Sequence, residues 1–242
     1  MPAELERPRV AAPIGGRFGE EAELVDVLKR QISLEKELEN AKVELALKPD
    51  FNLMDGFRMF DVYARGWVSP AEFADGLRDL GVFFDSADVD LFFKRFEKDR
   101  DNLLRYSDFC DAFTPLAQEY STILSSRGPY FIHRESYRPY EYFHPDTRLA
   151  LKNALRVHFQ VEASAEDLRK KQSRRPFFNV YDAFKMCDFD GRGFITGAEL
   201  YSLMKYHGFF ATDQEIDLLM ERYDKNRDGR ISYSEVSLRE RI

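Results

Sequence analysis

The sequence predicts an all-α protein in which two pairs of helix–loop–helix units are separated by an extended connector. A pattern of apolar-x-x-aromatic-acidic, followed eleven residues later by a second acidic residue, occurs four times. Within each pair the first acidic residues lie 36 positions apart, from Asp61 to Glu97 and from Asp188 to Asp224. Equal spacing in both pairs indicates that each pair folds as one lobe.

The four copies define twelve-residue loops at residues 61–72, 97–108, 188–199 and 224–235, called loops 1 to 4. A fixed separation allows the two loops of a lobe to face each other. Their eighth positions, Val68 with Leu104 and Ile195 with Ile231, are then expected to pair as short antiparallel strands.

Two helix starts agree with this register. Ser69-Pro-Ala-Glu72 and Thr212-Asp-Gln-Glu215 both have the spacing of a capping box, in which the hydroxyl and the carboxylate satisfy free backbone amides. The Ser69 and Glu72 pair is interpreted as a cap only, and not as part of a metal site.

The remaining segments lie outside the repeat. We expect an extended N-terminal arm at 1–18, a long helix at 19–48, the first lobe at 50–124, a connector at 125–146, an extra helix at 147–173 and the second lobe at 176–242. The connector contains Pro129, Pro139 and Pro145 together with six aromatic residues, so it cannot be one helix. It is expected to lie along a surface, either of its own lobes or of a partner.

Loop 4, DKNRDGRISYSE, has the residue types that a hard, oxygen-seeking cation requires. Calcium takes six to eight oxygens, which such a loop supplies from positions 1, 3, 5, 7, 9 and 12, with glycine at position 6 for the turn. Gly229 is that glycine. The expected ligands are Asp224, Asn226, Asp228, the Arg230 carbonyl, Ser232 and Glu235.

Loop 3, DFDGRGFITGAE, is a weaker calcium candidate because Arg192 stands at the fifth position, where a ligand belongs. Calcium would bind there only if this side chain moved away and water replaced it. The candidate ligands are Asp188, Asp190, the Phe194 carbonyl, Thr196 and Glu199.

Loops 1 and 2 are expected to be scaffolds. Loop 1 has Tyr63 and Arg65 at ligand positions and is predicted to be free of metal. In loop 2, Glu97 is too long for position 1, Asp108 is too short to bind an ion through both oxygens, and Arg105 stands at position 9.

Composition excludes several classes of function. The net charge of −7 argues against nucleic-acid binding, and two cysteines without metal spacing argue against zinc and favour the cytoplasm. No run of about 18 apolar residues predicts a membrane span. No catalytic motif is visible, so we do not expect an enzyme.

The four units resemble the calmodulin-like EF-hand superfamily through FRMFD, FKMCDFDGRGFITGAEL and MERYDKNRDGRISYSE. The segments RGPYFIHRESYRPYEYFHPDTRLALKNAL and SRRPFFNVYDAF resemble EF-hand microtubule inner proteins of ciliary and flagellar axonemes. The second resemblance implies a structural, cytoskeletal protein on the luminal wall of doublet microtubules, in contact with tubulin and neighbouring axonemal proteins.

Two functions remain open at this point. The first is a structural axonemal protein in which calcium rigidifies the C-terminal lobe, and the degenerate loops favour it. The alternative is a soluble calcium sensor that regulates an enzyme such as a kinase or phosphatase through an opened, Met-rich groove. Only Met186, Met204 and Met220 fall in the C-terminal lobe, so the structural function ranks first.

Overall fold

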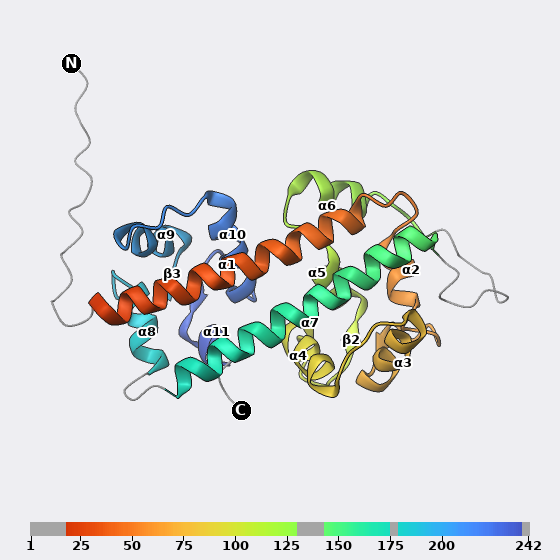
Figure 1. Cartoon of the computed structure of the whole chain (residues 1–242), viewed down its shortest axis with the longest axis horizontal. Coiled ribbons are helices and arrows are strands. Elements are labelled where there is room, and N and C mark those ends of the chain that lie inside the picture. Colours follow the sequence, from red (N-terminus) through yellow and green to blue (C-terminus); the bar gives the residue numbers. More distant parts are fainter. Residues whose placement is uncertain (1–17, 130–142, 175–178, 239–242) are drawn as a thin grey trace, which may run out of the picture. The chain divides into compact units, whose positions relative to one another are not determined.

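The computed structural model describes residues 18–129, 143–174 and 179–238 (Figure 1). It confirms the predicted all-α fold, in which the only strands of the described ranges are two-residue segments within the loops. The elements are α1 (Phe18–Ala46), α2 (Leu53–Arg58), β1 (Trp67–Val68), α3 (Pro70–Leu80), α4 (Ser86–Phe96), β2 (Leu104–Arg105), α5 (Tyr106–Phe113), α6 (Gln118–Ser125), α7 (Pro145–Ser173), α8 (Val180–Cys187), β3 (Phe194–Ile195), α9 (Gly197–Tyr206), α10 (Asp213–Tyr223), β4 (Ile231–Ser232) and α11 (Tyr233–Leu238).

The chain divides into two compact units. The larger unit comprises residues 31–175 and holds the N-terminal lobe, α2 to α5; the smaller unit comprises residues 1–30 and 176–242 and holds the C-terminal lobe, α8 to α11. The long helix α1 contributes residues to both units, a division that its uninterrupted helical pattern did not predict. No described helix has the length and apolar character needed to cross a membrane.

Both short strand pairs form in the predicted register. Val68 lies opposite Leu104, and Ile195 lies opposite Ile231. The capping boxes at Ser69 and Thr212 also form as predicted. The helix α7 begins at Pro145, two residues before the predicted start at 147, and its cap is His144, whose Nδ1 accepts from the amide of Asp146 at 3.4 Å. Pro145 explains the shift, because a proline suits the first helical position and loses no hydrogen bond there.

Phenylalanines form the core of the N-terminal lobe. Phe73 stacks on Phe92 with centroids 5.0 Å apart, and Phe57 meets Phe109 edge to face at 5.7 Å. Phe57 and Phe60 ahead of loop 1 and Phe93 ahead of loop 2 are buried inside the lobe. Phe143, at the end of the connector, is also buried and lies 5.5 Å from Phe51. The other connector aromatics belong to residues 130–142, outside the described ranges.

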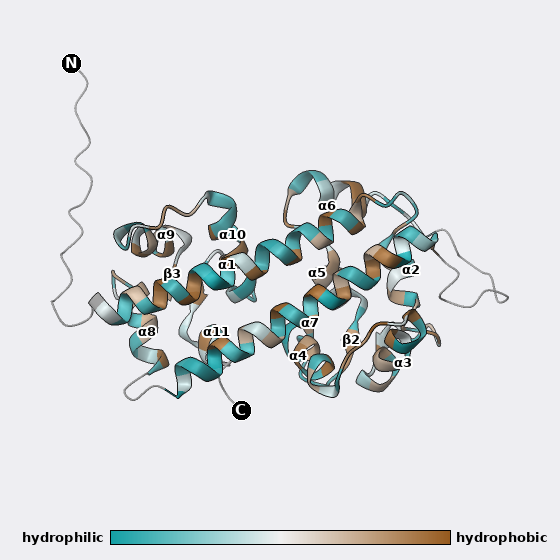
Figure 2. Ribbon diagram, in the orientation of Figure 1, coloured by the Kyte–Doolittle hydropathy of each residue, from teal (hydrophilic) through white to brown (hydrophobic). Residues whose placement is uncertain are grey.

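The helices α1 and α7 close over the N-terminal lobe within the larger unit. Figure 2 shows hydrophilic and hydrophobic residues interspersed along each of them. Leu45 of α1 and Leu151 and Leu155 of α7 are fully buried in the same core as the lobe's phenylalanines. The lobe therefore packs against helices of its own chain.

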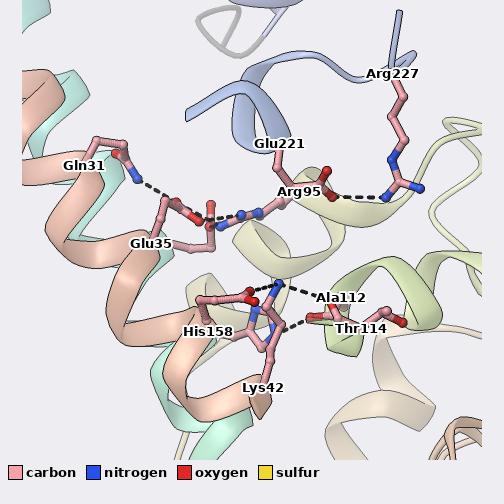
Figure 3. A network of polar contacts seen from close by, with 11 residues as sticks. Gln31, Glu35, Lys42, Arg95, Ala112, Thr114, His158, Glu221 and Arg227 are labelled. Atoms are coloured by element: carbon pink, nitrogen blue, oxygen red, sulfur yellow. Dashed lines mark hydrogen bonds and ion pairs between the residues drawn. The ribbon is translucent and has the colours of Figure 1, made fainter. Parts of the chain in front are cut away.

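A buried ionic cluster ties these three parts of the larger unit together (Figure 3). Arg95 of α4 pairs with Glu35 of α1 at 2.9 Å and with Glu162 of α7, and less than a tenth of each side chain is exposed. On the same face of α1, Lys42 donates to the Thr114 carbonyl at 3.2 Å, while Glu39 accepts from the Leu116 amide at 2.7 Å. These contacts fix α1 and α7 against the lobe.

Candidate calcium-binding loops

Loop 4 joins α10 to α11 around the turn at Gly229. The carboxylate of Asp224, at the C-terminal end of α10, accepts from the Gly229 amide at 2.7 Å and from the Asp228 amide at 3.2 Å. Gly229 has φ 78°, a conformation that costs glycine little and other residues much more. This turn brings positions 1, 5 and 6 of the loop together.

The twelfth residue of loop 4 reaches back to the beginning of the loop. Glu235 Oε1 accepts from the Lys225 amide at 3.0 Å, and Glu235 Oε2 accepts from the Ser232 amide at 2.8 Å and its hydroxyl at 2.7 Å. Between these ends, the Asp228 amide donates to the Asn226 side chain at 2.9 Å. The loop therefore closes on itself, with its acidic oxygens directed at backbone amides.

The predicted ligands of loop 4 fit calcium by their chemistry. Asp224, Asn226, Asp228 and Glu235 supply side-chain oxygens from one continuous loop, and the Arg230 carbonyl and the Ser232 hydroxyl complete the predicted set. The Arg230 guanidinium lies over the Phe194 ring at 4.5 Å from its centroid, within the neighbouring loop. In the arrangement described, no group of three or more His, Cys, Asp or Glu side chains is gathered as a metal site.

Internal cations occupy loop 3. Asp188 accepts from the Arg192 and Gly193 amides at 2.9 and 3.1 Å, and from Lys185 Nζ at 2.9 Å. Burial opposes ionisation of Asp188, but Lys185 and the two amides outweigh it, so its pKa lies below the usual value. Arg192 pairs with Asp190 at 3.3 Å and, at the far end of the loop, with Glu199 at 3.2 Å.

The rest of loop 3 has the shape of a binding loop. Glu199 Oε2 accepts from the Thr196 amide and hydroxyl at 2.9 and 2.7 Å, and Thr196 caps α9 because its hydroxyl oxygen accepts from the Glu199 amide at 3.4 Å. The other oxygen of the same carboxylate, Oε1, is buried and has no hydrogen-bond partner among the described atoms. Phe194, whose carbonyl is the predicted seventh-position ligand, begins β3.

Loop 1 is closed by an arginine. Asp61 accepts from the Arg65 and Gly66 amides at 2.9 and 2.7 Å, while the Arg65 guanidinium pairs with Glu72 and lies 3.7 Å from the centroid of Trp67. The pKa of Glu72 is lowered first by the Ser69 amide, then by the Ser69 hydroxyl and by Arg65. Both oxygens of Glu72 are thus engaged within the chain.

Loop 2 is closed by an arginine from a different position. Arg105 pairs with Asp99 at 2.9 Å and with Asp101 at 2.5 Å, and its hydrogen bond lowers the pKa of Asp101. Asp108, in the first turn of α5, accepts from the Arg105 amide at 2.9 Å, and burial raises its pKa. Asn102 makes the turn with φ 61°.

The loop pattern identified these arginines as residues that replace ligands but did not identify their partners. It also missed Lys185, which bonds to Asp188 from the last turn of α8. The contact of Lys185 could have been predicted from its position three residues before the first acidic residue of the loop, because side chains at this spacing meet on a helix. Loop 4 has Glu221 at the equivalent place.

Both lobes of the chain match a known protein family. The EF-hand domain pair family matches residues 50–114 and 177–237, more than half of the chain. The chain belongs to this EF-hand family. Each match covers one lobe, including both of its loops, and no catalytic family is indicated.

Several calcium-binding proteins are similar to this EF-hand chain. The probable calcium-binding protein CML11 of Oryza sativa subsp. japonica is 27% identical over 185 residues, which cover 76% of this chain and 64% of that protein. Human calcium-binding protein 7 is 34% identical over 56 residues, 23% of this chain and 26% of that protein. The chain spans less than two thirds of the length of each relative. Together with the family match, these similarities indicate that this protein binds Ca²⁺.

Proposed function

We propose that this chain is a structural EF-hand protein of the ciliary or flagellar axoneme, bound to doublet microtubules as a microtubule inner protein that stabilises the tubulin lattice. The supporting observation is the closed N-terminal lobe, in which Arg95 is buried between Glu35 and Glu162. A lobe whose core is shared with α1 and α7 serves as a fixed shape, because helices of its own chain already pack against its apolar interior.

Closed, metal-poor loops support the same proposal. In loops 1 and 2 the side chains of Arg65 and Arg105 hold the acidic residues, so these loops keep their shape without calcium. A protein that is needed for its shape can lose ligands and retain its packing. A sensor, by contrast, requires loops whose structure changes when calcium binds.

Calcium is assigned to the C-terminal lobe, in loop 4. The ion would be held there by Asp224, Asn226, Asp228, the Arg230 carbonyl, Ser232 and Glu235. It would serve as a common partner for oxygens from both ends of the loop. Asp224 terminates α10 and Glu235 lies in the first turn of α11. Holding both residues would fix the angle between the two helices, so calcium stiffens this lobe.

The proposed partners are tubulin and neighbouring axonemal proteins; nucleic acid, membrane and a catalysed reaction are not part of the proposal. Contact is assigned to the N-terminal arm and to the connector, most of which lies outside the described residues. This assignment rests on the resemblance of the connector and the following helix to axonemal EF-hand proteins. Lattice binding suits long segments outside the lobes, because many weak contacts add together.

Fractionation of axonemes from ciliated cells tests the proposal. Tagged wild-type protein and Glu235→Gln are expected to stay with the axonemes after washes with salt, calcium or chelator, because calcium serves only to stiffen one lobe. Absence of the wild-type protein from washed axonemes would refute the axonemal role.

A soluble calcium sensor that regulates an enzyme such as a kinase or phosphatase is the second candidate. It is favoured by exposed aromatic side chains in the C-terminal lobe, among them Tyr206 and Phe210, of which 51% and 69% are exposed. The same fractionation distinguishes it. Calcium-dependent release of the wild-type protein, abolished in Glu235→Gln, would select the sensor.

A further inference from the structure

Loop 3 contains a positive charge of its own where calcium would bind. The guanidinium of Arg192, the fifth residue of the loop, lies 3.3 Å from Asp190 and 3.2 Å from Glu199, the residues at positions 3 and 12. We propose that Arg192 acts as an internal cation that competes with calcium for these carboxylates and thereby sets the calcium affinity of loop 3. The loop is held closed by arginine in the absence of metal, and calcium enters only by displacing it.

The same pairing of a fifth-position arginine with the twelfth-position carboxylate also occurs in loop 1, so two loops of this chain share it. Arg65 is also a fifth residue and pairs with Glu72 at position 12. In both loops the guanidinium lies over the aromatic ring of the seventh residue, at 3.7 Å for Trp67 and 4.7 Å for Phe194. The ring holds the guanidinium by a cation–π contact beside the acid.

Loop 3 differs from loop 1 in retaining a place for a metal. Glu199 is 93% buried, since its exposed fraction is 7%, yet its Oε1 has no hydrogen-bond partner among the described atoms. A buried carboxylate oxygen without a partner is costly, and a calcium ion bound through both oxygens of this glutamate would satisfy it. In loop 1 both oxygens of Glu72 are engaged, by Arg65 and Ser69, and Tyr63 replaces the acid at position 3.

The strength of the arginine contact favours competition over permanent exclusion. The Arg192 side chain is 44% exposed, and its partners Asp190 and Glu199 are 64% and 9% exposed, so water reaches the guanidinium and screens its attraction to Asp190 most. An exposed ion pair is worth no more than about a factor of five in an equilibrium constant. Lys185, which bonds to Asp188, is the second internal cation that calcium meets in this loop.

Calcium calorimetry on the full chain tests the proposal. Loop 4 is first silenced by Glu235→Gln, and the double variant Arg192→Ala with Glu235→Gln is compared with Glu235→Gln alone. Alanine removes the guanidinium and adds no ligand oxygen. We expect calcium affinity at loop 3 to rise about fivefold or more, because the screened ion pair and the repulsion between arginine and calcium are both lost.

A second readout identifies the loop that responds. The Gly193 amide bonds to Asp188, so its NMR resonance should move with calcium at lower concentrations in the double variant. Arg65→Ala with Glu235→Gln is the matched control, since it removes the corresponding arginine from a loop without the acid at position 3. It should gain no calcium site.

Unchanged affinity in a folded Arg192→Ala double variant, or an equal gain in the Arg65→Ala control, would overturn the proposal. Folding is checked by circular dichroism without calcium, and Arg192→Met, which also adds no ligand oxygen, replaces alanine if that variant unfolds. The proposal concerns loop 3 and is independent of the axonemal role. The single variant Glu235→Gln, compared with wild type, reports separately on loop 4, so the two assignments can fail independently.

Discussion

The guanidinium of Arg95 on α4 lies 2.9 Å from the carboxylate of Glu35 on α1, and both side chains are buried. Glu162 on α7 shares the same guanidinium. One positive charge thus faces two negative charges away from water, and each depends on the others for compensation. Such an arrangement specifies how α1, α4 and α7 pack, because any other register would leave a buried charge unpaired.

Arg95→Met should therefore destabilise the larger unit by about 3 to 5 kcal/mol, the cost of leaving a buried ion without its partner. The single tryptophan, Trp67, lies in this unit, so its fluorescence during urea unfolding of the full chain gives the measurement. Arg78→Met is the control, because Arg78 pairs with Asp75 on the surface and both side chains are more than half exposed. A comparable loss in the two variants would contradict the role assigned to the cluster.

Glu235→Gln should remove the strong calcium site of the chain. The twelfth residue is expected to bind calcium through both oxygens, and an amide offers one neutral oxygen in place of a charged pair. Wild-type protein should gain about 3 kcal/mol of stability in the C-terminal lobe at calcium concentrations near one hundred times Kd, and the variant should gain none.

Glu72→Gln provides the matched comparison for that experiment. It makes the same change at position 12 of loop 1, where Arg65 already occupies the carboxylate. Calorimetry should then report the wild-type stoichiometry for Glu72→Gln and the loss of the strong site for Glu235→Gln. Two or more strong sites in the wild-type chain would contradict the assignment of loops 1 to 3.

Gly76→Ala should destabilise the N-terminal lobe although alanine is the better helix former. An added Cβ would lie 2.5 Å from Cδ1 of Phe60, a ring that is 2% exposed and packed against Phe73 and Phe109. Overpacking of this kind costs about 1 to 3 kcal/mol, against a gain in helix propensity of about 1 kcal/mol. Gly19→Ala, in α1 with no atom within 4 Å of the new carbon, should not destabilise the protein. Trp67 fluorescence for the first variant and circular dichroism for both give the comparison.

Sequence patterns were sufficient to predict the elements that depend on residues close together in the chain. The loop spacing predicted both strand pairs, and the capping boxes at Ser69 and Thr212 formed where the side chains indicated. These features depend on residues within one or two turns of each other. Hydrogen-bond geometry over such short distances leaves few alternatives.

The contacts that decide function could not be predicted in the same way. Arg192 and Arg65 were recognisable as residues that replace ligands, but only the folded loops bring them to Glu199 and Glu72. Likewise, no pattern local to α1 indicates the buried cation that Glu35 meets. Arg95 follows 60 residues later, and their contact depends on how separate helices pack.

His158 should make the larger unit less stable in mild acid. The imidazole is fully buried among Phe92, Phe96 and Phe113, and its Nε2 lies 3.0 Å from the Ala112 carbonyl. Burial lowers its pKa from 6.5 to about 3, and the nearby charges of Arg95 and Lys42 act in the same direction. The neutral ring donates from Nε2, which leaves Nδ1 without a partner.

The unfolded chain takes up a proton at this histidine near pH 6.5, whereas the folded chain resists it until about pH 3. Stability contributed by the neutral ring is therefore complete above pH 6.5 and falls as pH decreases, by about 1 kcal/mol per pH unit. Urea unfolding followed by Trp67 fluorescence between pH 7 and about pH 5 isolates this effect, because most carboxylates titrate at lower pH. His158→Gln keeps a donor for the Ala112 carbonyl and should flatten the dependence of the free energy of unfolding on pH. His144→Gln, at an exposed side chain, should leave that dependence unchanged. If the free energy of unfolding still falls with decreasing pH in His158→Gln, another group is responsible for the acid sensitivity.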